Sequence, residues 1–200
     1  LLAIEDTPEL PVAALQATGR DVQRLNAAPD DDTELSPAAA LRTALRLGDG
    51  ALAVGEVRGP EAAVLYEAMR VGAASSAVLG TIHGEGAAGV RERVVSDLGV
   101  PASSFETTDL VVTIVPDGTA RRVASVEEVT GTGPQPLFAL GADGIEPTGR
   151  IGRGNSEFVA SIADPAESYA DVRQALTAAG DRFGGASSRE TEQPAAAVSR

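Results

Sequence analysis

An acid and a base directly follow a short apolar run in residues 48–59, which read GDGALAVGEVRG. The acid is Glu56 and the base is Arg58. A carboxylate at the carboxyl end of a buried strand lies where open α/β sheets form their ligand crevice. There it can bind Mg²⁺ through water, or orient the water that attacks a phosphate. The alternative is a strand-end acid that only meets solvent.

A second apolar run, LLAI, also ends in acids. It is followed by Glu5, Asp6 and Glu9. If this strand lies beside the one that precedes Glu56, several carboxylates converge on one cation. Asp6 to Glu9 can also be read as a cap and turn without chemistry.

The third polar strand end carries the only histidine of the chain. His83 closes the run GTIH. A lone histidine is more often structural than catalytic, but one that follows a third strand end joins the same predicted edge.

The first half of the chain has the alternation of an α/β fold, and its 43% hydrophobic content is enough for one substantial core. We expect strands at residues 1–4, 51–54 and 77–82, helices at 36–47, 60–72 and 90–98, and a solvated loop over 19–35. Ser36-Pro37 is an N-cap followed by proline at the first helical position.

From Leu110 the pattern changes to short β-like runs. We expect strands at 110–115, 122–129, 137–140 and 158–162, then a helix from Asp164-Pro165 to about Ala179. The Gly-, Ser- and Ala-rich residues from Gly184 onward predict a disordered tail.

The charge balance excludes several classes of function. There are 29 acidic residues against 16 basic ones, and every basic residue is arginine. A net charge of −13 argues against a broad nucleic-acid or anionic-membrane surface and suggests a cytoplasmic protein of a halophile. The absence of cysteine excludes disulfides and thiol catalysis, and no apolar run is long enough to span a membrane.

Five segments in order resemble the type II/IV secretion ATPase family: IEDTPEL, LRTALR, GALAVGEVRGPEA, AMRVG and GTIHGEG. The resemblance covers about residues 1–130, and the lysine-free composition fits a haloarchaeal member. It implies a RecA-like P-loop NTPase core that binds ATP and Mg²⁺ between the subunits of a hexameric ring. It further implies a cytoplasmic protein at the inner face of the membrane, acting on a membrane platform protein of a secretion, pilus or archaellum system.

The resemblance also implies roles for individual residues. Glu5, Asp6 and Glu9 match the acidic "Asp box", Glu56 matches the Walker B glutamate on the Mg²⁺ and water side, and His83 matches the γ-phosphate-sensing "His box". Glu5, Glu56, Arg58 and His83 are thus the candidate catalytic residues, Asp6 and Glu9 the candidate nucleotide-binding ones, and Glu56 the candidate metal ligand. Arg58 either pairs with Glu56 or Glu61 or reaches phosphate.

The phosphate-binding motif G-x-x-x-x-G-K-[ST] is not in this sequence. In the family it lies upstream of the IEDTPEL strand, so we expect a partial core without the Walker A strand and loop, cut ahead of Leu1. The predicted units are the partial ATPase domain at 1–130, a small β-rich region with a terminal helix at 131–183, and the tail at 184–200. The alternative is a P-loop-free ring component or regulatory binding module. A DNA-transfer motor would share every motif.

Overall fold

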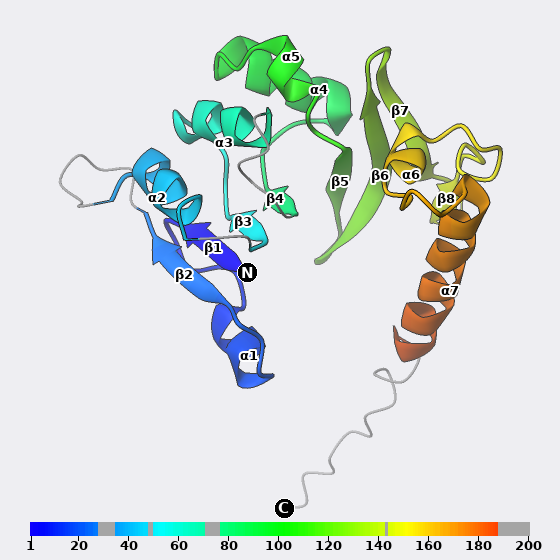
Figure 1. Ribbon diagram of the computed structural model, residues 1–200, viewed down its shortest axis with the longest axis horizontal. Helices are drawn as coiled ribbons and strands as arrows, with labels where there is room; N and C mark the ends of the chain where they lie inside the picture. The colour runs from blue at the N-terminus through cyan, green and yellow to red at the C-terminus, as the bar shows by residue number, and fades with distance from the viewer. Residues whose placement is uncertain (28–34, 48–49, 71–76, 143, 188–200) are drawn as a thin grey trace, which may run out of the picture.

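The computed structural model describes residues 1–187 except 28–34, 48–49, 71–76 and 143. Within these residues the chain forms two sheets of different kinds, one parallel and one antiparallel (Figure 1). The predicted α/β class is confirmed, with a β-rich region and a final helix after the parallel layer.

The parallel sheet has the strand order β2-β1-β3-β4. Its members are β1 (Leu2–Glu5), β2 (Gln23–Asn26), β3 (Leu52–Val54) and β4 (Val78–Gly80). Ile4 pairs with both Leu25 and Val54, and Val54 pairs with Gly80. This register aligns the carboxyl ends of all these strands along one edge.

Helices cover this sheet through apolar side chains. The helices of this half are α1 (Val12–Ala17), α2 (Pro37–Ala44), α3 (Glu61–Arg70), α4 (Gly86–Glu92), its π-helical continuation η1 (Arg93–Asp97) and α5 (Ala102–Phe105). The main core joins strand residues such as Ile4 and Val54 to Leu41, Leu65 and Phe105 of the helices. The predicted cap of α2 is confirmed, because the Ser36 hydroxyl accepts the Ala39 N–H at 3.3 Å.

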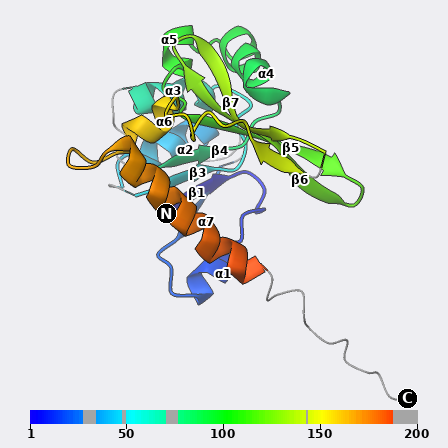
Figure 2. The same ribbon diagram turned by 90° about the vertical axis from the view of Figure 1, so that its right-hand side faces the viewer.

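The antiparallel sheet follows with the order β5-β6-β7-β8. It consists of β5 (Leu110–Asp117), β6 (Ala120–Thr130), β7 (Gly133–Leu140) and β8 (Ile145–Pro147). The Glu127 carboxylate of β6 accepts the Ala87 N–H of α4 at 2.9 Å, which ties this sheet to the first half. Two helices follow, α6 (Glu157–Ser161) and α7 (Tyr169–Ser187), on the side of the sheet away from β1–β4 (Figures 1 and 2).

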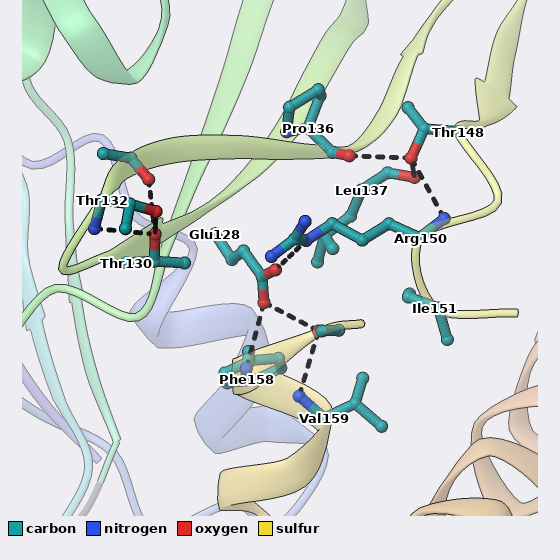
Figure 3. Close-up of polar contacts among 12 residues, drawn as sticks. Glu128, Thr130, Thr132, Pro136, Leu137, Thr148, Arg150, Ile151, Phe158 and Val159 are labelled. Carbon is teal, nitrogen blue, oxygen red and sulfur yellow. Dashed lines mark hydrogen bonds and ion pairs between the residues drawn. The ribbon is translucent and has the colours of Figure 1, made fainter. Parts of the chain in front are cut away.

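A buried carboxylate fastens α6 to the antiparallel sheet. Glu128 of β6 is 1% exposed and accepts hydrogen bonds from Arg150 Nε, the Ser156 hydroxyl at 2.8 Å and the Phe158 N–H at 3.0 Å (Figure 3). Burial raises the pKa of this carboxyl, but the hydrogen bonds lower it by more, so its pKa lies below the ordinary 4.5.

Three secondary-structure predictions were wrong. Residues 158–162, predicted as a strand, lie mostly in α6, because the Ser156 hydroxyl accepts the Val159 N–H at 3.2 Å and starts a helical turn. Residues 23–26, predicted as loop, form β2. The Asp164 N–H donates to the Glu167 carboxylate at 3.1 Å, as a capping box predicts, but within a turn. α7 starts only after Ser168, whose hydroxyl donates to the Asp171 carboxylate and accepts the Asp171 N–H.

The predicted domain bounds stay a prediction. The antiparallel sheet already begins at Leu110, inside the segment 1–130 expected to be the partial ATPase domain. α7 continues through Ser187, past the predicted start of the tail at Gly184. Residues 188–200 of the predicted tail lie outside the described residues. So do the first two residues of the segment GDG, at 48–49.

Candidate functional site

The polar strand ends meet at the carboxyl edge of the parallel sheet. Asp6 follows β1, Glu56 follows β3 by two residues and His83 follows β4 by three. Because the strand ends are in register, loops that leave them start side by side. The structure brings Asp6, Glu56, Arg58 and His83 into one connected group.

Arg58 is the centre of this group. Its guanidinium donates to Asp6 Oδ2 through one terminal nitrogen and to Glu56 Oε2 at 3.1 Å through the other. The two carboxylates are therefore held by one shared cation, which cancels their mutual repulsion. The side chains of Asp6 and Glu56 are 30% and 29% exposed, so the group is open to solvent.

His83 closes the group on the side of β4. Its Nε2 lies 3.3 Å from Glu56 Oε1, and its side chain is 94% exposed. The Thr81 hydroxyl donates to the Gly55 carbonyl, and the Val57 N–H donates to the Thr81 carbonyl at 2.8 Å. These bonds fix the His83 loop against the segment that carries Glu56.

Glu5 is placed differently from the other candidates. It is 3% exposed, and its Oε1 accepts the Glu9 and Leu10 N–H groups at 2.9 and 2.6 Å. Its Oε2 accepts Arg24 Nε at 2.9 Å. Glu5 thus holds its own loop. Within the described residues, no hydrogen bond or ion pair links the Glu5 or Glu9 carboxylate to Glu56, Arg58 or His83.

Two further residues hold this edge, and neither was predicted as a site residue from the sequence. Glu61, 4% exposed in the first turn of α3, accepts the Arg58 and Gly59 N–H groups at 2.7 and 2.8 Å. Pro60 and Glu61, at the start of the predicted helix, were the sequence feature that could have indicated this role of Glu61. Arg24 lay in a segment expected to be loop, and its polar neighbours gave no sign of β2. The Arg58 side chain pairs with Glu56, whereas Glu61 accepts only the backbone N–H of Arg58.

An open pocket of about 270 Å³ adjoins the group. Asp6, Glu56 and Arg58 line it together with Glu5, Glu61 and apolar side chains of β1, β3 and α2. Ser36 and Pro37, at the start of α2, form another part of its wall. The pocket therefore combines four acidic residues and a guanidinium with an apolar wall, an arrangement that suits a ligand with a charged and an apolar end.

The oxygen donors at this edge suit Mg²⁺ better than a transition metal. Carboxylates are hard ligands, and Mg²⁺ in phosphate-transfer sites uses one or two of them together with water and substrate oxygens. In the part of the chain that the structure describes, no three histidine or acidic residues are grouped so that they could hold a metal by themselves. The donor set thus fits an ion bound mainly through substrate and water.

Comparison with known proteins decides the family. The family model described as "Type II/IV secretion system protein" matches residues 1–163. The chain belongs to this family. A search among curated proteins gives no significant match.

Among solved structures, the chain is similar to the VirB11 ATPase of the Brucella suis type IV secretion system, determined in complex with sulphate. The sequences are 24% identical, the TM-score is 0.48, and the match covers 64% of this chain and 39% of that one. The match of this chain thus spans well under half the length of the VirB11 ATPase chain. Among the described helices, none combines the length and apolar character needed to cross a bilayer.

Proposed function

We propose that the complete protein hydrolyses MgATP, and that the edge formed by Asp6, Glu56, Arg58 and His83 is its hydrolytic side. The observation that carries this proposal is the convergence of these four side chains beyond three parallel strands, next to a pocket. Family membership supports it.

Glu56 is the residue that would act on water. Its Oε2 accepts from Arg58 and its Oε1 lies 3.3 Å from His83 Nε2, and a carboxylate oxygen has room for more than one hydrogen bond. Each oxygen can therefore also orient a water toward the γ-phosphate. A bound Mg²⁺, held by Glu56 through water, would neutralise charge on the phosphates.

Arg58 and His83 would act on the phosphate side. The Arg58 guanidinium lines the pocket and can exchange a carboxylate for a phosphate oxygen. The exposed His83 ring can change partner when a γ-phosphate is present, because no packing fixes it. Asp6 and Glu9 are proposed to support nucleotide binding from the adjoining loop.

For the assembly we propose a homo-hexameric ring with ATP between subunits. It would act in the cytoplasm, at the inner face of the membrane, on a platform protein of a secretion, pilus or archaellum system. We further propose a haloarchaeal source. Support comes from the family, from the motif order and from the lysine-free acidic composition.

The test is Glu56→Gln in the complete protein. Nucleotide affinity should be kept, because charge but not shape is lost, while turnover of ATP should fall about 100-fold or more. The matched control is Glu67→Gln, which removes an exposed carboxylate of α3 paired with Arg70 outside the site.

Unchanged turnover in Glu56→Gln would reject the assignment. If the complete wild-type protein binds no nucleotide at all, the alternative is favoured, a P-loop-free ring component or regulatory binding module.

A further inference from the structure

Arg24 of the edge strand β2 contacts the last residue of β1 and the acidic loop that follows it. Its Nε donates to Glu5 Oε2 and its terminal nitrogen donates to the Leu10 carbonyl, both at 2.9 Å. One planar guanidinium thus binds a buried carboxylate and a backbone carbonyl at once. Lysine cannot reproduce this fork with the same geometry.

Glu5 extends these contacts into the loop. The bonds of Arg24 and Glu5 to Glu9 and Leu10 are called the clamp below. The other oxygen of Glu5 accepts the N–H groups of Glu9 and Leu10. Both ends of the segment Glu5–Leu10 are therefore fixed to one another. Gly55 lies directly against Glu5, since a Cβ at Gly55 would approach Glu5 Cγ to 3.1 Å and the Ile4 carbonyl oxygen to 3.3 Å.

Asp6 lies in the loop that the clamp holds. Asp6 follows Glu5 directly and is bonded to Arg58, 52 positions further along the chain. Arg58 in turn binds Glu56, which contacts His83. Polar contacts therefore cross the whole parallel sheet, from Arg24 on β2 to His83 beyond β4.

We infer that Arg24 is a positioning residue for the hydrolytic edge. Acting through Glu5 and Leu10, it fixes where Asp6 stands and so how Arg58 presents Glu56. This inference rests on the proposed function. Glu5 belongs to the same clamp, because its buried oxygens already serve three protein donors.

The experiment replaces Arg24 in the complete protein. In Arg24→Met the amide exchange of Glu9 and Leu10 should become about tenfold faster, because their acceptor loses its fixed position. The kcat for ATP should fall about 10-fold to 100-fold while KM stays within about twofold, because the site is misaligned rather than removed.

Two further variants make the test specific. Arg24→Lys keeps a charge for Glu5, so the fold should persist, while kcat recovers only in part. Arg20→Met is the matched control, since it removes an exposed arginine just before β2, and it should leave both amide exchange and kcat unchanged.

Wild-type kcat in a folded Arg24→Met protein would overturn the inference. So would amide exchange that rises equally across the whole chain, because this would show a general loss of stability. If the wild-type protein itself hydrolyses no ATP, the proposed function fails, whereas selective exchange at Glu9 and Leu10 would still establish the clamp.

Discussion

Arg58 determines how two acids can stand next to each other at the edge of the sheet. Its side chain is 47% exposed and bridges Asp6 and Glu56. Ion pairs with this much solvent contact contribute little to folding, typically about 0–1 kcal/mol. The value of the bridge therefore lies in the geometry of the two carboxylates.

We expect Arg58→Met to separate stability from function. The free energy of unfolding should change by less than about 1 kcal/mol, because the bridge is exposed. Turnover of ATP in the complete protein should fall at least about tenfold, because Asp6 and Glu56 lose their common partner. Urea unfolding and steady-state kinetics measure the two effects.

The control is Arg70→Met, which breaks the exposed pair of Arg70 with Glu67, 2.7 Å, on α3. It removes the same charge and should leave turnover intact. A stability loss of several kcal/mol in Arg58→Met would instead mark a structural role.

At this scale the sequence predicted that acids, an arginine and the histidine meet at the edge, but it did not indicate the roles of Arg24 and Glu61 or which way each side chain faces. Glu5 and Asp6 are adjacent acids, and only the structure shows that Glu5 turns inward to its own loop. Strands of a parallel sheet are buried on both faces, so alternation does not distinguish an inward acid from an outward one. The partner that decides the matter, Arg24, lies 19 positions away.

Among the elements, β6 carries a buried carboxylate outside the site, Glu128. Glu128 binds Arg150, Ser156 and Phe158, and so connects β6 to the loop before α6 and to α6 itself (Figure 3). Removing one partner of a buried, hydrogen-bonded ion pair leaves the other charge uncompensated. This cluster should therefore control the attachment of the C-terminal helices.

We predict that Glu128→Gln loses about 3 kcal/mol of unfolding free energy at pH 7. The amide has only one accepting atom, whereas donors occupy both oxygens of the carboxylate. The folded-state pKa of Glu128 is lowered, so its stabilisation is fully present above the ordinary pKa of 4.5 and is lost as pH falls through the lower folded-state value.

The difference between wild type and Glu128→Gln should accordingly shrink as the pH falls below 4.5. Urea unfolding at a series of pH values and constant ionic strength measures it. The matched control is Glu106→Gln, which removes an exposed acid after α5 outside the Glu128 cluster. A difference that stays constant down to pH 3 would contradict the assigned pKa direction.

The elements themselves were predictable where a local signal was unambiguous. Ser36-Pro37 gave the start of α2, and the apolar runs gave β1, β3 and β4. The segment FVASI at 158–162 was not predictable, because four apolar residues in a segment of five have no clear period. Its helical form depends on the Ser156 cap, and the Ser156 hydroxyl is itself bound to Glu128 on a distant strand.

At the scale of the whole molecule, the dominant feature is charge. The net charge is −13, and the cations present are arginines, several of them already paired with acids at the site and at Glu128. The remaining acids repel one another across the surface, which opposes the compact state. Salt relieves this repulsion, because the screening length falls from about 10 Å at 0.1 M to about 3 Å at 1 M.

We therefore expect the free energy of unfolding to rise by about 1–2 kcal/mol between 0.1 and 1 M KCl, the size of a few charge–charge interactions across water. Thermal and urea unfolding at stepped KCl concentrations measure the slope. The control variant carries Glu92→Gln, Glu106→Gln and Glu157→Gln, three exposed acids outside the site whose side chains make no bond to Glu128. It removes three negative charges, so its stability should depend less steeply on salt. Equal slopes for both proteins would mean that KCl acts through hydrophobic burial rather than screening, and the acidic surface would then not be what limits stability at low salt.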